Sequence, residues 1–310
     1  MSLSQFKTNI FSVVGHLKEK NLKLGTDRNG EQYLSGNVVI EAVCALAGSD
    51  TKRNNNIRIN VFQRPYTKSG RDNKLYASAL DVMNNFNIGD KMFAGGDISY
   101  NSFTGRDGKL RESNRLRGLF FYHRDENTPD RAQGEIDVVY LGQKPARNKD
   151  EVRLSVFTVG YNGRISKVLN LEASKDDFSD VRRDTKVGLI FSIENYTNTV
   201  SEDNDLFSRI GKVRENKQQV VTNKFVNRLY AYKPEIIKGD QPTHDEILNA
   251  VKELRQAKTI SENAVAQSLP TSMSTPEKKN QQPQQQVKQP TDPFATEDKP
   301  ISISEDDIPF

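Results

Sequence analysis

The sequence predicts a mainly β protein made of two five-stranded Greek-key barrels, followed by one helix and a disordered C-terminal tail. Apolar and polar residues alternate with a period of two over much of the chain, which is typical of half-buried strands. Dipeptides such as Asn29-Gly30 and Asn162-Gly163 separate the alternating runs and favour tight hairpins. After Ser268, apolar residues become too sparse to offset the entropy of ordering the chain.

The first unit, residues 1–128, is predicted to hold five strands with a helix between the third and the fourth. The strands are expected near residues 11–17, 32–42, 57–64, 91–103 and 116–123. Helical spacing is followed instead by Leu75, Ala79, Val82, Met83 and Phe86, and Gly89-Asp90 ends that helix. This order of elements is that of the OB fold, a small Greek-key barrel.

The second unit, residues 129–240, repeats the pattern of short alternating strands. These are expected near residues 135–141, 152–161, 164–172, 187–193 and 224–232. The helix signal is weak, because residues 176–183 are few and polar. A second OB-like barrel is the preferred interpretation, and a different small barrel stays open.

The C-terminal region is divided by composition. Thr243 and Glu246 form a capping box, which predicts a helix over residues 241–267. Residues 268–300 are rich in Gln and Pro and predict a disordered linker. Residues 301–310 form a short acidic end.

Charge is distributed unevenly between the body and this end. The formal net charge is +4, and residues 291–310 hold one Lys against six acidic residues. The end therefore carries −5 and the rest of the chain +9. A basic body with an acidic end favours a polyanionic partner, although ordinary solubilising charge gives the same pattern.

The remaining composition indicates a soluble protein of a reducing compartment. Cys44 is the only cysteine, so no intrachain disulfide can form. No apolar run approaches the ~20 residues that cross a bilayer, and the N-terminus lacks a signal pattern. A cytoplasmic location is expected, with no membrane partner.

The last residues resemble the C-terminal tip of the bacterial single-stranded DNA-binding protein (SSB) family. The chain ends in Asp306, Asp307, Ile308, Pro309 and Phe310 behind the polar linker. Looser similarities occur in the first unit, at residues 14–17, 59–64 and 95–103. The resemblance implies an OB fold, binding of single-stranded DNA, and recruitment of replication and repair proteins by the tip. Those partners include a helicase, primase, nuclease or recombination mediator.

The chain also departs from that family. It has two predicted barrels where one is usual, and it has no Trp, a common stacking residue in the family. These departures favour a bacteriophage-encoded relative or a divergent bacterial member. Two barrels per chain favour a homodimer, and a monomer with two barrels stays open.

Single strands are held by aromatic rings that stack on bases and by cations that follow the phosphates, so both should share one strand face. The residues that meet this test are Arg58, Phe62, Arg64, Tyr66, Tyr100, Phe103, Arg115 and Arg117 in the first unit, and Arg153, Phe157, Tyr161, Lys224, Arg228 and Tyr230 in the second. Phe120, Phe191 and Phe225 are expected in the core instead.

No catalytic pattern emerges from the sequence. His16, His123 and His244 are far apart, and neither Gly108-Lys109 nor Gly211-Lys212 completes a phosphate-binding loop. We therefore expect no enzyme activity, no cofactor and no metal. A phage recombination annealing protein, or an adaptor acting only through the tip, are the alternatives.

Overall fold

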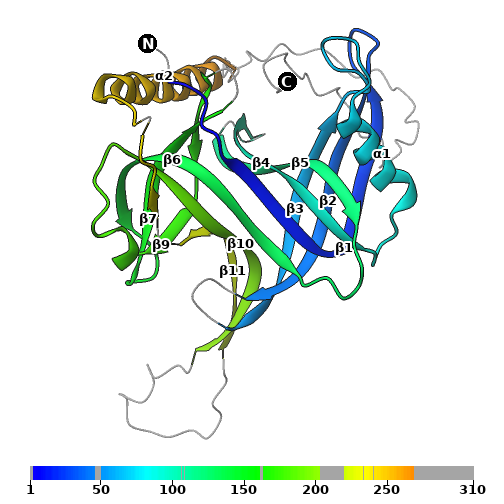
Figure 1. Cartoon of the computed structure of the whole chain (residues 1–310), viewed down its shortest axis with the longest axis horizontal. Coiled ribbons are helices and arrows are strands. Elements are labelled where there is room, and N and C mark those ends of the chain that lie inside the picture. Colours follow the sequence, from blue (N-terminus) through cyan, green and yellow to red (C-terminus); the bar gives the residue numbers. More distant parts are fainter. Residues whose placement is uncertain are drawn as a thin grey trace, which may run out of the picture.

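The computed structural model describes residues 3–45, 50–105, 107, 109–160, 163–202, 220–232, 234–239 and 241–268. Their strands join into one 12-stranded sheet that curls into two barrels lying side by side (Figure 1). The fold class predicted from the sequence, mainly β with OB-like barrels, is confirmed. The predicted linker and tip lie outside the described residues.

The first barrel closes in the strand order β1-β2-β3-β5-β4 and back to β1. Four of its contacts are antiparallel, and β3 and β5 meet in parallel only where Asn60 pairs with Arg117. Helix α1 (Lys74–Asn85) lies between β3 and β4 in sequence, as predicted, and buries Ala79 and Val82. The strands are β1 (Asn9–Thr26), β2 (Gln32–Ala45), β3 (Lys52–Gln63), β4 (Lys91–Thr104) and β5 (Leu110–His123).

The second barrel has the same strand order, β6-β7-β9-β11-β10 and back to β6. Its parallel contact, between β9 and β11, corresponds to that of β3 and β5 in the first barrel. A short 3-10 helix, η2 (Asp176–Phe178), stands where the first barrel has α1. The strands are β6 (Arg131–Pro145), β7 (Glu151–Val159), β8 (Ile165–Val168), β9 (Leu171–Ser174), β10 (Thr185–Glu202), β11 (Val220–Ala231) and the short β12 (Glu235–Ile236).

Strand β1 joins the two barrels. Its first part pairs with β4 on one edge and with β6 on the other, and its second part pairs with β2. The register between β1 and β2 shifts at Leu17 and Glu19, where a bulge bends the strand. One cluster of buried side chains therefore runs through both barrels, from Leu34 in the first to Phe191 in the second.

Helix α2 (His244–Ser268) covers the outer face of the second barrel together with the N-terminal segment (Figure 1). Leu3, Phe6 and Ile247 pack there against outward-pointing residues of β6 and β7. The capping box of α2 forms as predicted, because the Thr243 backbone N–H donates to the Glu246 carboxylate at 2.9 Å. This bond holds the pKa of Glu246 below its usual range.

The strand predicted over residues 164–172 is wrong in one respect. It breaks at Asn170, whose φ of 50° lies in the left-handed region that Asn tolerates better than most residues. The break separates β8 from β9 and lets the backbone N–H of Leu229 donate to the Asn170 carbonyl at 3.0 Å.

Candidate nucleic-acid interface

The outer face of β2 and β3 presents an aromatic pair beside a cation. Ile57 and Ile59 point into the barrel and are buried, so the alternate side chains of β3 face outward. Among these, the ring of Phe62 lies 5.4 Å from that of Tyr33 on β2, in a stacked arrangement. Arg58 is exposed on the same face. The sequence predicted Phe62 and Arg58 on this face, but it did not predict the contribution of Tyr33.

A row of amides crosses this face next to the aromatic pair. Asn21 on β1 pairs with Asn37 on β2, which pairs with Asn60 on β3. Side chains of directly paired residues point to the same side of a sheet and lie close together. The buried Oδ1 of Asn37 accepts no hydrogen bond from the described residues. The row thus places three amide side chains on the face that also carries Phe62 and Arg58.

The cations of this face differ in how they are paired. Arg64 forms ion pairs with Asp27 and Glu31, and Arg117 holds Asp97 through two nitrogens. Arg58 has no ion pair with any residue in the described ranges. It can therefore meet a phosphate without first losing a carboxylate.

A cleft of about 480 Å³ lies between the two barrels, beside Arg58. Leu116, Ile193 and Leu229 contribute apolar surface to it, and Phe225 lines it from β11. Its volume is within the ~300–1,000 Å³ of typical ligand sites. The cleft continues the outer face of β3 onto the second barrel.

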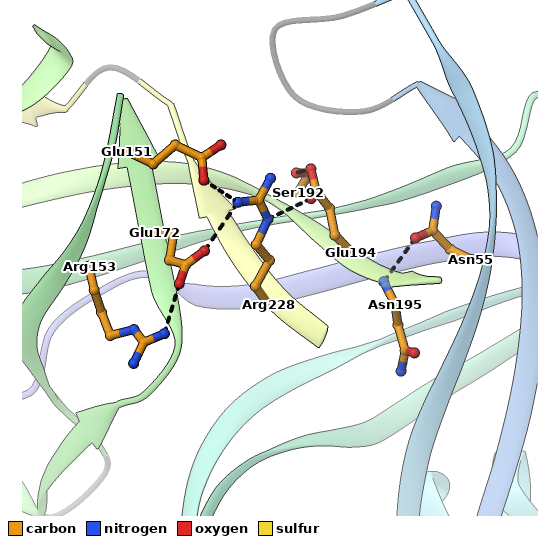
Figure 2. Close-up of polar contacts among 8 residues, drawn as sticks. All are labelled: Asn55, Glu151, Arg153, Glu172, Ser192, Glu194, Asn195 and Arg228. Carbon is orange, nitrogen blue, oxygen red and sulfur yellow. Dashed lines mark hydrogen bonds and ion pairs between the residues drawn. The ribbon is translucent and has the colours of Figure 1, made fainter. Parts of the chain in front are cut away.

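Two sets of hydrogen bonds hold the barrels together around this cleft. The buried side chain of Asn55 on β3 accepts from the backbone N–H of Asn195 on β10 at 2.9 Å (Figure 2). Asn114 on β5 bonds both the N–H and the carbonyl of Leu169, in the turn between β8 and β9. Because these contacts come from different strands, they resist both the sliding of one barrel along the other and the opening of the cleft between them.

The hairpin of β4 and β5 carries three more of the predicted residues. Phe103 and Arg115 are exposed. Tyr100 is half-buried and donates to Glu112, with Lys167 of the second barrel 5.7 Å from its ring centre. Burial, and then the bond to Glu112, raise the pKa of Tyr100 to about 12. Tyr100 therefore helps to join the barrels and is less open than the prediction required.

Tyr66 lies in the loop after β3 and is one of the most exposed large side chains, at 61%. The backbone N–H of Thr67 donates to the carbonyl of Arg71 at 2.8 Å and closes this loop. The loop carries Tyr66 outward from the same strand that bears Phe62.

In the second barrel, Arg228 lies within a cluster of carboxylates (Figure 2). Its guanidinium is 2.8 Å from Glu194, 2.6 Å from Glu151 and 3.1 Å from Glu172. Burial alone would lower the pKa of Arg228, but these carboxylates raise it overall. Glu172 also pairs with Arg153 at 2.9 Å. The prediction of Arg228 as a phosphate contact is thus corrected, because its charge is already matched by three anions.

The prediction of Phe157 as a stacking residue is also corrected. Phe157 does point outward from the barrel, as its alternation with Arg153 indicated, but it is fully buried. The N-terminal segment and α2 cover it. Sequence periodicity shows the face of a strand on which a residue lies, and it does not show what packs on that face.

The remaining residues of the second barrel that were predicted to bind DNA lie in different surroundings. Lys224 is exposed on β11. Tyr230 packs its ring 4.7 Å from the guanidinium carbon of Arg228. Tyr161 and the tip residues lie outside the described residues.

Sequence reasoning placed two exposed rings in the core, and both placements are wrong. Phe225 lies on the same side of β11 as Leu229, whose side chain points into the second barrel. At Phe225, however, the hairpin of β10 and β11 extends along the first barrel, and the ring is 62% exposed. Phe120 lies on the outer face of β5 and is exposed, whereas Phe191 is buried as expected.

The functional site contains no recognisable metal centre in the part of the chain that the structure describes. Neither of the described helices has the length and hydrophobicity needed to span a bilayer.

Comparisons with known proteins give one family and several solved structures. A family model described as YorF matches residues 7–268. Compared by sequence with curated proteins, the chain matches none. The wild-type single-stranded DNA binding protein from Thermus aquaticus is 14% identical over 76% of this chain and 95% of that one, with a TM-score of 0.49. The mitochondrial single-stranded DNA binding protein Rim1 of S. cerevisiae is 15% identical over 38% of this chain and 96% of that one, with a TM-score of 0.24.

Replacement of Arg228 tests its role in the carboxylate cluster. Arg228→Met should lower the free energy of unfolding by about 3–5 kcal/mol at pH 7, because it leaves buried carboxylates without a cation. Urea unfolding measures this free energy. Arg153→Met is the control, and its half-exposed ion pair should be worth no more than about 1 kcal/mol. Equal losses in the two variants would contradict this role.

Proposed function

We propose that this chain, which belongs to the YorF family, binds single-stranded DNA without requiring a particular sequence and protects it in replication, recombination and repair. The observation that carries the proposal is the outer face of β3. There the stacked rings of Phe62 and Tyr33 lie on the same face as Arg58, which has no ion pair among the described residues.

Stacking explains why an unpaired strand is the preferred ligand. Each base stacked on an aromatic ring contributes about 1–3 kcal/mol, and every base has a face that can stack. In a duplex those faces are already stacked on neighbouring bases. The proposed path of the DNA runs from Tyr66, in the loop after β3, past Phe62 to Phe225 in the inter-barrel cleft. Tyr66 and Phe225 are largely exposed.

We further propose that the C-terminal tip recruits replication and repair proteins. The support is the sequence alone: Ile308 and Phe310 are apolar residues next to Asp306 and Asp307, at the end of a polar tether. A pocket with a basic rim on a helicase, primase, nuclease or recombination mediator matches this chemistry. Burial of the Phe310 ring contributes about 1.5–3 kcal/mol.

We also propose that the protein acts as a homodimer. Ile10, Phe120, Tyr122 and Ile190 are exposed on the outer face of the sheet formed by β10, β6, β1, β4 and β5. Ile10 and Ile190 flank Glu135 in adjacent strands. Several exposed large apolar side chains on one face of a sheet are typical of protein interfaces. A two-fold dimer would bury the same patch on both copies.

Two alternatives are separated by the same experiments. A recombination annealing protein would also bind single strands, but it would assemble into rings or filaments larger than a dimer. An adaptor would use the tip without binding DNA. The aromatic and cationic face of β3 favours the DNA-binding function over the adaptor.

Titration of a fluorescent oligo-dT and a matched duplex tests DNA binding. The single strand should bind tightly and the duplex much more weakly. Affinity should fall with salt at a slope near −0.7 per phosphate neutralised, because each contact releases counterions. Phe62→Ala and Arg58→Gln should each weaken binding of the single strand about tenfold.

Arg131→Gln is the matched control, since Arg131 is exposed on β6 away from the proposed path. It should bind like the unaltered protein. Equal affinity for single strand and duplex would contradict the DNA-binding proposal.

Removal of residues 301–310 tests the tip. The shortened chain should bind oligo-dT as tightly as the full chain or more tightly, because an acidic end competes with DNA for basic groups. Single-stranded DNA is then immobilised and coated with either the full or the shortened chain. Purified helicases, primases and nucleases from the cell that makes this protein are tested for retention on it. The full chain should retain at least one of them and the shortened chain none. A full chain that binds partner proteins through the tip but does not bind oligo-dT would favour the adaptor.

Sedimentation tests the dimer. The full chain should sediment at twice its mass of 35.1 kDa. Tyr122→Asp should sediment as a monomer, because it places charge in the apolar patch. Tyr66→Asp, an exposed ring away from that patch, should leave the dimer intact. Particles much larger than a dimer would favour the annealing protein, and a monomeric full chain would contradict the dimer.

A further inference from the structure

We infer that the cleft between the barrels recognises the edges of unpaired nucleobases, adenine above all, through asparagine side chains. The inference rests on the proposed binding of single-stranded DNA. It adds a site that distinguishes bases to a surface that otherwise takes any sequence.

Four asparagines from both barrels reach the cleft with unused amides. They are Asn60 on β3, Asn170 in the turn after β8, Asn195 on β10 and Asn227 on β11. No hydrogen bond is described for the side-chain amide of any of the four within the described ranges. Two further asparagines at the cleft are occupied, because Asn56 accepts from Lys18 and Asn114 is bonded to Leu169.

An amide side chain offers a donor and an acceptor together, which is what the edge of a base requires. Asn pairs with adenine in this way, donating to N7 and accepting from the N6 amino group. The apolar surface of Leu116, Ile193 and Leu229 lies among the amides and suits the face of a planar ring. A nucleobase combines these two surfaces, a polar edge and an apolar face.

The charges of the cleft argue against a phosphate as its main ligand. The cleft has two cations among its described lining residues, and Arg228 is already matched by three carboxylates. That leaves Arg58 as the cation without a carboxylate partner among the described lining residues, and Glu19 adds a negative charge. The electrostatic attraction of the cleft for a phosphate would therefore be weak, whereas the uncharged amides suit an uncharged base.

The amides are also held in place before any ligand binds. The backbone of Asn195 is fixed by the buried Asn55, and the turn that carries Asn170 is fixed by Asn114 and by Leu229. Asn60 and Asn227 lie within strands. Groups that are already positioned lose little entropy on binding, so their hydrogen bonds discriminate well.

The test compares oligonucleotides that stack alike and differ at the base edge. Affinities are measured for a 2′-deoxyadenosine oligomer and for an equally long oligomer of purine deoxyriboside, which keeps the ring and lacks the N6 amino group. The adenine oligomer should bind about fivefold to tenfold more tightly. The double variant Asn60→Ala/Asn227→Ala should abolish this ratio and leave the salt slope unchanged. Asn84→Ala, an exposed asparagine on α1, should preserve the ratio.

The outcomes separate this inference from the function on which it rests. Tight binding of both oligomers with a ratio near one, or a ratio that survives in the double variant, would overturn the base-edge site and leave single-strand binding intact. A loss of salt dependence in the double variant would also overturn it, because the asparagines would then act through phosphates. No binding of any single strand would overturn the proposed function itself.

Discussion

Backbone hydrogen bonding by β1 is the interaction on which the rest of the architecture depends. This strand closes the first barrel against β4 and β2, and its first residues also form the edge to which β6 of the second barrel pairs. A strand in the middle of a sheet must satisfy donors and acceptors on both sides, so its partners cannot shift independently. The cleft, the amide row and the outer apolar patch all owe their positions to this shared strand.

Much of the fold was predictable because its signals are local. Alternation located most strands, and helical spacing located α1 between β3 and β4. The capping residues Thr243 and Glu246 marked the start of α2. The break at Asn170 was missed because the alternation of residues 164–172 continues across it, and the bond from Leu229 that accompanies the break is tertiary.

The site was predictable only where the outer face of a strand stays open. Arg58 and Phe62 lie on the predicted face, because alternate side chains of β3 point out of the barrel and nothing more was needed to place them. Phe157 and Arg228 have the same parity, but the former is covered by α2 and the latter is matched by carboxylates from three other strands. Such neighbours come from distant parts of the chain, so their effect on a residue appears only in three dimensions. The asparagines of the cleft were missed for the same reason.

The pairing of β1 with β6 also has a kinetic consequence for a long ligand. Because the barrels share one sheet, a single-stranded DNA that contacts both of them under the proposed function would, when released from one barrel, stay beside it at a high effective concentration for rebinding. No flexible linker has to be ordered for the second contact to form. Complete dissociation of the DNA then requires both contacts to open at once. The DNA should therefore stay bound much longer than it would on either barrel alone. Under the proposed function, a single chain with this geometry would act as a chelator of nucleic acid.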